Sequence, residues 1–346
     1  MRSTPRNRTR LLLGAGAAGV AAVLGLGALA AAPASAARSQ EKSQEKTLHV
    51  AYLSFAVQNS YDAPMLAAAR AQAKRDHVVL TVFDANNSPT TQYSQLQDVI
   101  TAHQYQGVIV QPIFGTGLLG LVREAIARHI AVADLDQELG PNLHTDQPQV
   151  KGLAANVVFV PTEIGTKLGQ LVVTACKTHN PCNVGYMYDI KASALDEAIH
   201  GAFMAQIKGH ANIKIVAEGQ SFFTPSDGLT AAQNMLTANP DLTLIVGSDQ
   251  GIEGAQQAVA AAGKTGKVIL VGYGASAAAL KGIRSGAWYG DVAQLPATEG
   301  RLAVEDLASF IRTGVSAGGV DPVAELPDGG VITKANVGLF HAEWPG

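Results

Sequence analysis

The feature that most constrains this chain is an alternation of two kinds of apolar segment. Runs of strand length that are apolar throughout alternate with longer stretches in which apolar residues recur at helical spacing. Strands that are apolar on both faces are typical of parallel sheets covered by helices on both sides. In the first half of the chain this alternation therefore predicts a doubly wound α/β lobe. Its predicted strands are residues 48–53, 78–84, 107–112 and 130–136, and its predicted helices are residues 63–76, 91–104 and 117–129.

A second alternation of similar length follows residues 141–155, which contain two prolines and have no period. Two such lobes enclose a cleft at the carboxyl ends of their strands, where open α/β sheets bind ligands. The second series predicts strands at 156–160, 182–189, 213–219, 242–249, 267–274 and 288–294, and helices at 163–176, 194–208, 226–238, 252–262, 276–285 and 297–312.

The N-terminal segment contains LLLGAGAAG at residues 11–19, which has the G-x-G-x-x-G spacing of a dinucleotide-binding turn. Four arginines precede it, however, and the first acidic residue is Glu41. A basic start, an apolar stretch and Ala34-Ser35-Ala36 are the layout of a secretory signal. We expect residues 1–36 to be a cleaved Sec-type signal peptide without a lipid anchor, and residues 37–46 to form a flexible N-terminus. The alternative is an uncleaved membrane anchor. Export to a periplasm or cell envelope is predicted.

Composition excludes several kinds of function. Charged residues make up 15% of the chain and the net charge is −3, so no nucleic-acid partner is predicted. The two cysteines, Cys176 and Cys182, are expected to form a disulfide in an exported protein, with free thiols as the alternative. Their spacing does not fit a zinc or redox site, and the histidines have no metal-ligand spacing. No metal and no cofactor are predicted.

The loops after the predicted strands share a distinctive composition. They are rich in Asn, Gln, Asp, Ser, Tyr and Phe, and poor in Lys and Arg. Carboxylates and amides bond hydroxyl groups, and aromatic rings cover the apolar faces of sugar rings. These loops therefore favour a neutral polyhydroxylated ligand over a phosphate. They are residues 54–64, 83–89, 134–138, 187–193, 220–227, 247–251, 272–276 and 292–300.

The order of several motifs resembles that of the type I periplasmic sugar-binding proteins of ABC importers, in particular the ribose-binding group, which shares its fold with LacI-type effector domains. The resemblance covers roughly residues 47–340, and its motifs are NNSP, GVIVQP, IAVADLDQ, AAQNMLTANPDL, SDQGIEGAQQAVAAAG, KVILVGYG and VAQLPATEG. It implies two doubly wound, parallel-sheet lobes joined by a three-strand hinge, one of residues 47–160 and 295–325, the other of residues 161–294 and 326–346. It also implies closure of the lobes on the ligand.

The resemblance implies a binding protein rather than an enzyme. Its ligand would be a small sugar or polyol, its partner an ABC permease with its ATPase, and it would act as a monomer. A receptor that serves a sensor kinase is an alternative. A second alternative is a hydrolase, because G-x-D-x-G around Asp249 follows a predicted strand like a nucleophile elbow, with His341 as the base.

The same resemblance implies which residues bind the ligand, beginning with four in the first lobe. Tyr61 lies where the family has a ring-stacking aromatic residue, and Asp62 lies where a second aromatic is common. Asp136 matches the carboxylate that grips adjacent hydroxyls, and Gln137 replaces an arginine of the ribose group. Phe223 matches an aromatic residue of the second lobe.

In the second lobe, Ser248 lies at the position of the usual asparagine, next to Asp249, and Gln294 matches a glutamine beside the hinge. Asp249 either binds ligand or caps the following helix, which would leave Ser248 and Gln250 as the contacts. Gly274 stands where an aspartate normally grips the ligand. Two arginines and this aspartate of the ribose pattern are missing. The ligand therefore stays open between a neutral polyol, another sugar and an amine-bearing compound.

Overall fold

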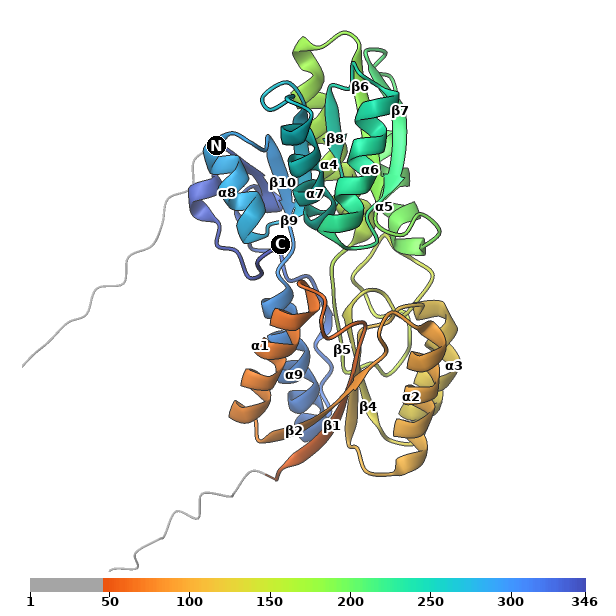
Figure 1. Ribbon diagram of the computed structural model, residues 1–346. Coiled ribbons are helices and arrows are strands. Elements are labelled where there is room, and N and C mark those ends of the chain that lie inside the picture. The colour runs from red at the N-terminus through yellow and green to blue at the C-terminus, as the bar shows by residue number, and fades with distance from the viewer. Residues whose placement is uncertain (1–45) are drawn as a thin grey trace, which may run out of the picture. The chain divides into compact units, whose positions relative to one another are not determined.

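The computed structural model describes residues 46–346, so the predicted signal peptide lies outside the described residues. Within them the chain forms two six-stranded sheets, each flanked by helices (Figure 1). The prediction of two doubly wound α/β sheets is confirmed.

The first sheet has the strand order β11-β5-β4-β3-β1-β2, and its neighbouring strands pair in parallel. Its strands are β1 (Leu48–Ser54), β2 (Val78–Asp84), β3 (Gly107–Val110), β4 (Ala131–Asp136), β5 (Ala155–Val158) and β11 (Gly318–Val320). Helices α1 (Asp62–Arg75) and α9 (Pro296–Thr313) cover one face, and α2 (Pro89–Ala102) and α3 (Gly115–Ala127) cover the other (Figure 1). Apolar side chains fill both faces, which explains why the strands read as continuous apolar runs.

The second sheet has the order β12-β10-β9-β8-β6-β7. Its strands are β6 (Cys182–Tyr188), β7 (Ile213–Gln220), β8 (Leu244–Val246), β9 (Ile269–Gly274), β10 (Gly290–Ala293) and β12 (Val331–Thr333). Helices α4 (Pro161–Ala175) and α5 (Ala194–Ile207) cover one face, and α6 (Pro225–Ala238), α7 (Asp249–Ala261) and α8 (Ala277–Ser285) cover the other. β12 departs from the predicted parallel arrangement because it pairs antiparallel with β10. A short 3-10 turn at Pro327–Gly330, rather than a crossover helix, leads into β12.

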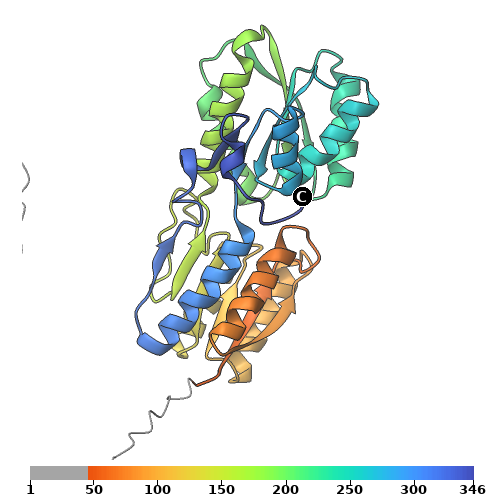
Figure 2. The ribbon, with the colours of Figure 1, turned by 90° about the vertical axis from the view of Figure 1, so that its left-hand side faces the viewer.

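The chain passes between the two sheets three times within the described part: after β5, after β10 and after β11. Figure 2 shows α9 beside the first sheet, in blue, although its sequence follows that of the second sheet. The residue bounds of the two lobes stay a prediction.

Capping residues set where the helices begin. Ser248 is the N-cap of α7, since its hydroxyl accepts a hydrogen bond from the Gly251 backbone N–H at 3.4 Å. Helix α7 consequently begins at Asp249, three residues before the predicted start at 252, and the strand predicted at 242–249 is reduced to β8. Both predicted boundaries were wrong there, because the apolar pattern does not show that the polar residue Ser248 caps the helix.

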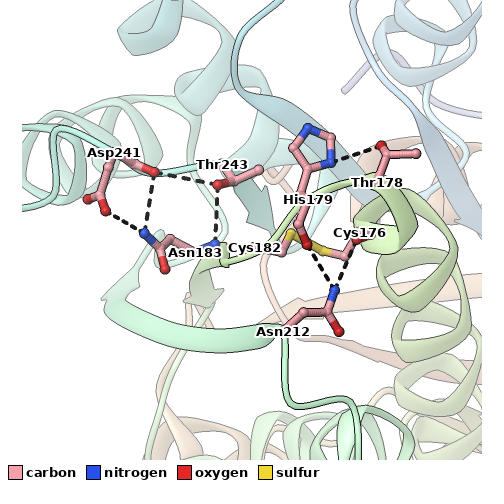
Figure 3. The surroundings of a disulfide bond; sticks show 8 residues. All are labelled: Cys176, Thr178, His179, Cys182, Asn183, Asn212, Asp241 and Thr243. Atoms are coloured by element: carbon pink, nitrogen blue, oxygen red, sulfur yellow. Dashed lines mark hydrogen bonds between the residues drawn. A yellow bond between two sulfur atoms is a disulfide. The ribbon is translucent and has the colours of Figure 1, made fainter.

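A disulfide joins Cys176, which follows α4, to Cys182 at the start of β6 (Figure 3). Both cysteines are fully buried. The amide of Asn212 donates to the carbonyls of Cys176 and His179 at 3.0 Å each, so the bridged loop is also tied to the segment before β7. The predicted disulfide is confirmed.

Candidate binding site

A cavity lies at the carboxyl ends of strands from both sheets. The structure brings to it most of the ligand-binding residues predicted from the sequence. These are Tyr61, Asp62, Asp136, Gln137, Phe223, Ser248 and Gln294. Their contact with a ligand stays a prediction. Gln250, which the sequence left as an alternative to Asp249, also lines the cavity. The remaining lining residues were not predicted from the sequence: they are Phe55, Asn59, Gln111, Phe159, Leu195, Tyr273 and Trp344.

Two carboxyl groups on the first-sheet side of the cavity share one amide. The Nε2 of Gln111, directly after β3, donates to Asp62 Oδ1 at 2.7 Å and to Asp136 Oδ2 at 3.1 Å. The Gln111 Oε1 accepts from the Phe55 backbone N–H at 2.9 Å, which fixes the direction of the amide. Both aspartates are 95% buried, with 5% of their surface exposed. One nitrogen therefore reaches both carboxylates.

Burial governs the protonation of these carboxyls. Desolvation, together with the charge of Asp136, raises the pKa of Asp62 to about 8. Desolvation raises the pKa of Asp136 to about 7. Behind them, Glu299 of α9 is fully buried and accepts from the Tyr61 hydroxyl at 3.3 Å, and burial raises its pKa well above the ordinary value. Around neutral pH this part of the cavity thus holds acids that ionise only at a free-energy cost.

The loop after β4 holds Asp136 in a strained backbone conformation. Asp136 has a φ of 71°, in the left-handed region that L-residues seldom adopt. The buried Asp134 supports this turn by accepting from the Leu139 backbone N–H at 2.6 Å. Phe223, on the opposite side, has a φ of 56°. Strained positions of this kind gather at functional sites, and here both line the cavity.

A buried aspartate organises the second-sheet side. Asp189, directly after β6, accepts hydrogen bonds from the hydroxyls of Ser221, Ser248 (2.6 Å) and Tyr273 (2.7 Å). Burial raises its pKa, whereas the three hydroxyl donors act to lower it. Asp189 does not line the cavity itself. It joins the ends of neighbouring strands and fixes Ser248 and Tyr273, which do line it.

Asp249 is the predicted site residue that the structure does not bring to the cavity. It is fully buried, and its Oδ2 accepts from the Ser276 backbone N–H at 2.7 Å. Its carboxyl interacts with that of Asp291, which is equally buried and whose pKa burial raises well above the ordinary value. A Cβ at Gly272 would lie 2.5 Å from an oxygen of each carboxyl, so the pair needs a glycine beside it. Asp249 therefore acts in the interior and cannot attack a substrate.

Trp344 fills the space left where the ribose pattern has an aspartate. Its indole N–H donates to the Gly274 carbonyl at 2.6 Å, and its ring meets that of Tyr61 edge to face at 5.3 Å. A Cβ at Gly274 would lie 2.6 Å from the indole, so no larger residue fits there. The neighbouring Glu343 accepts from the Thr298 hydroxyl of α9 at 2.6 Å. This segment thus supplies an aromatic wall in place of a carboxylate.

Side chains from the two sheets also meet across the cavity. The Gln250 amide donates to Asn59 Oδ1 and to Ser60 Oγ at 3.1 Å each. The Asn59 amide donates to the Phe223 carbonyl at 3.4 Å, and the rings of Phe55 and Phe223 lie 6.2 Å apart. The cavity is therefore bounded by both sheets at once.

Among the described residues, no group of three or more His, Cys, Asp or Glu side chains is arranged to hold a metal ion. In the same part of the chain, none of the helices is long and apolar enough to cross a membrane.

Comparison with known families matches residues 50–314 to the periplasmic binding protein domain. The chain belongs to the periplasmic binding protein family. Among curated relatives of this periplasmic binding protein, the D-allose-binding periplasmic protein of Escherichia coli (strain K12) is 28% identical over 70% of this chain and 78% of its own length. The D-apiose import binding protein of Paraburkholderia graminis is 27% identical over 84% of this chain and 90% of its own.

Solved structures share the fold of this periplasmic binding protein. A solute-binding protein of Mycobacterium smegmatis with bound glycerol matches with a TM-score of 0.71 and 24% identity, covering 87% of this chain and all of that one. A solute-binding protein of Bacillus halodurans C-125 with bound myo-inositol matches with a TM-score of 0.73 and 21% identity, covering 87% of this chain and 100% of that one. The predicted family and fold are confirmed. The relatives are named as binding proteins, which supports the prediction of a binding protein over that of a hydrolase.

Proposed function

We propose that this periplasmic binding protein is the solute-binding component of an ABC importer and captures a small sugar or polyol. The observation that carries the proposal is the cavity, in which carboxylates, amides and aromatic rings from both sheets converge. Carboxylates and amides suit hydroxyl groups, and rings suit the apolar faces of a sugar. Curated relatives that bind D-allose and import D-apiose support the same class of ligand.

The proposed mechanism is closure of two lobes on the ligand. The lobes comprise residues 47–160 with 295–325, and 161–294 with 326–346. A ligand that bonds Asp136 from one lobe and Ser248 from the other touches both, so it favours the closed state by its differential contacts. The hydrogen bonds from Gln250 to Asn59 and Ser60 are contacts that closure would make and opening would break.

The proposed setting follows from the sequence. Residues 1–36 act as a cleaved signal, and the mature protein works outside the cytoplasm, as the periplasmic relatives do. The closed form docks as a monomer on a permease that is driven by its ATPase. Nucleic acid has no part in this function.

Isothermal titration with a panel of pentoses, hexoses and polyols tests the proposal. At least one compound should bind with a 1:1 stoichiometry. Asp136→Ala should weaken that binding at least several-fold, because a charge-assisted hydrogen bond to a buried hydroxyl is lost. Glu305→Gln, which removes a carboxylate from the exposed face of α9, is the matched control and should bind as the wild type does. If no compound in the panel produced saturable heat, the sugar and polyol function would be contradicted.

A further inference from the structure

We infer that the preferred ligand of the cavity is a polyhydroxylated compound that carries a primary ammonium group, bound between Asp62 and Asp136. This inference rests on the proposed function and narrows its substrate class. It is carried by the arrangement of carboxylates, aromatic rings and charge around a cavity that both sheets line.

Gln111 Nε2 bonds Asp62 at 2.7 Å and Asp136 at 3.1 Å, so a single nitrogen can reach both carboxylates. Gln111 lies directly after β3, and it lines the cavity together with both aspartates. An ammonium group carries three donors and a full positive charge. Entering from the cavity, it would repeat the bridging role of Gln111 with three donors instead of two.

The charged side chains that line the cavity are the acids Asp62 and Asp136. No Lys, Arg or His is among the described residues that line the cavity. The ion pairs among described side chains, Arg128–Glu124, Lys167–Glu163, Lys191–Glu218 and Arg301–Glu305, all lie elsewhere. The charges that raise the pKa of Asp62 are those of Asp136 and Asp84. The charges that raise the pKa of Glu299 are those of Asp136, Glu343 and Asp62. All of them are acids. The positive charge of Arg70 acts to lower the pKa of the buried Tyr52. With a neutral ligand these buried acids ionise only at a free-energy cost, whereas an ammonium group supplies the counter-charge that stabilises their ionised form.

The aromatic lining suits the ring of a sugar and also an ammonium group attached to it. Six aromatic side chains surround the cavity, contributed by both sheets and by the segment after β12: Phe55, Tyr61, Phe159, Phe223, Tyr273 and Trp344. Ring faces attract cations, most strongly when water is excluded, and cages of aromatic residues are a recurrent way to bind ammonium groups. Rings beside two buried carboxylates favour an organic cation over a metal ion, since a metal would take oxygen ligands on most sides.

Titration of the full mature protein with matched pairs tests the inference. Each pair differs only in an amine: D-glucosamine and D-glucose, D-galactosamine and D-galactose, 1-amino-1-deoxysorbitol and sorbitol, and 3-amino-1,2-propanediol and glycerol. We expect the amine of at least one pair to bind at least tenfold more tightly than its neutral partner. At pH 6.5, where both aspartates are mostly protonated, a bound ammonium should also expel protons. The measured heat should then depend on the ionisation enthalpy of the buffer.

Variants assign the effect to the two carboxylates. Asp62→Asn and Asp136→Asn keep the shape of the side chain and remove its charge, so each should reduce the amine-to-neutral affinity ratio at least tenfold. Glu305→Gln removes one charge far from the cavity and should leave the ratio unchanged. Since the wild-type ratio and the proton release need no variant, the test holds even if a variant fails to fold.

The outcomes separate the two proposals. Neutral members that bind as tightly as their amines, with no proton release, would overturn the inference and leave the sugar and polyol function intact. If no member of any pair bound but another compound of the wider sugar and polyol panel did, the inference would be overturned and the function would stand. If nothing in either set bound, the function would be contradicted, and the inference with it.

Discussion

Replacing Asp62 by asparagine should stabilise the ligand-free protein at high pH. The carboxyl of Asp62 is 95% buried, and burial raises its pKa to about 8, compared with 3.8 as the ordinary value. In the unfolded chain this carboxyl ionises near pH 4, so between pH 4 and 8 the folded state binds more protons than the unfolded state does. The contribution of Asp62 to stability therefore falls as the pH rises through this range, and the asparagine variant has no such penalty.

The magnitude follows from the shift. A difference of about 4 pKa units corresponds to roughly 5–6 kcal/mol at pH 9, at about 1.4 kcal/mol per unit. Asparagine keeps one acceptor oxygen, whereas the carboxylate accepts from both Gln111 and the Ala56 backbone N–H, so the variant loses one hydrogen bond at a cost of about 1–2 kcal/mol. We expect the free energy of unfolding of Asp62→Asn to exceed that of the wild type by about 3–4 kcal/mol at pH 9. At pH 5 the raised pKa of Asp62 costs only about 1.7 kcal/mol, which the lost hydrogen bond offsets, so the two proteins should agree within about 1 kcal/mol.

Urea denaturation of both proteins at pH 5, 7 and 9 measures this difference. Acids that do not contact Asp62, such as Glu138, titrate in both proteins, and their contributions to the free energy of unfolding cancel in the comparison. Glu305→Gln should show no comparable dependence on pH. A difference between Asp62→Asn and the wild type that had the same sign and size at pH 5 and pH 9 would refute the reasoning, because the charge of Asp62 would then cost nothing on folding.

Three further changes test the framework around the site. Gly272→Ala places a methyl group 2.5 Å from two buried carboxyl oxygens and should lower the free energy of unfolding by about 2–3 kcal/mol. An unchanged denaturation curve would show that the surrounding side chains can move to accommodate the methyl group. The double change Cys176→Ser with Cys182→Ser should lower it by about 2 kcal/mol, since the bridged loop is short, and equal stability of the two proteins in non-reducing buffer would argue against the bond. Asp189→Ala leaves three hydroxyls without their acceptor and should lower it by at least about 3 kcal/mol in thermal unfolding, with weaker ligand binding; an unaltered melting temperature would remove Asp189 from its organising role.

The sequence predicted the architecture well because the central strands of each sheet are buried on both faces and are therefore mostly apolar, whereas the edge strands β2 and β7 are partly exposed. It did not predict β11 and β12, which have three residues each and lie at the sheet edges. Runs so short carry no period, and β11 begins with two glycines. Strand β8 was predicted too long, because nothing in an apolar pattern marks where the Ser248 cap begins.

The site was predicted as far as strand ends could show it. Gln111 was within reach, since it follows β3 directly, but a lone glutamine has no signal that distinguishes it from a solvated one. Trp344 could not be found in this way. It lies in a segment without regular structure that folds back between Tyr61 and Gly274, and only the tertiary fold brings these together. Asp249 is the opposite case, because its place after a strand predicted that it lines the site, whereas its carboxyl lies in the interior.

The fluorescence of Trp344 tests the central claim, that ligand binds in the cavity between the two sheets. The chain has two tryptophans, of which Trp344 lines the cavity and Trp288 is buried in the core of the second sheet. Saturation with a ligand identified by titration should change the emission of the wild type. The change should be lost in Trp344→Phe, in which Trp288 alone reports. An unaltered change in Trp344→Phe, or a wild-type spectrum that does not respond to a bound ligand, would contradict the claim.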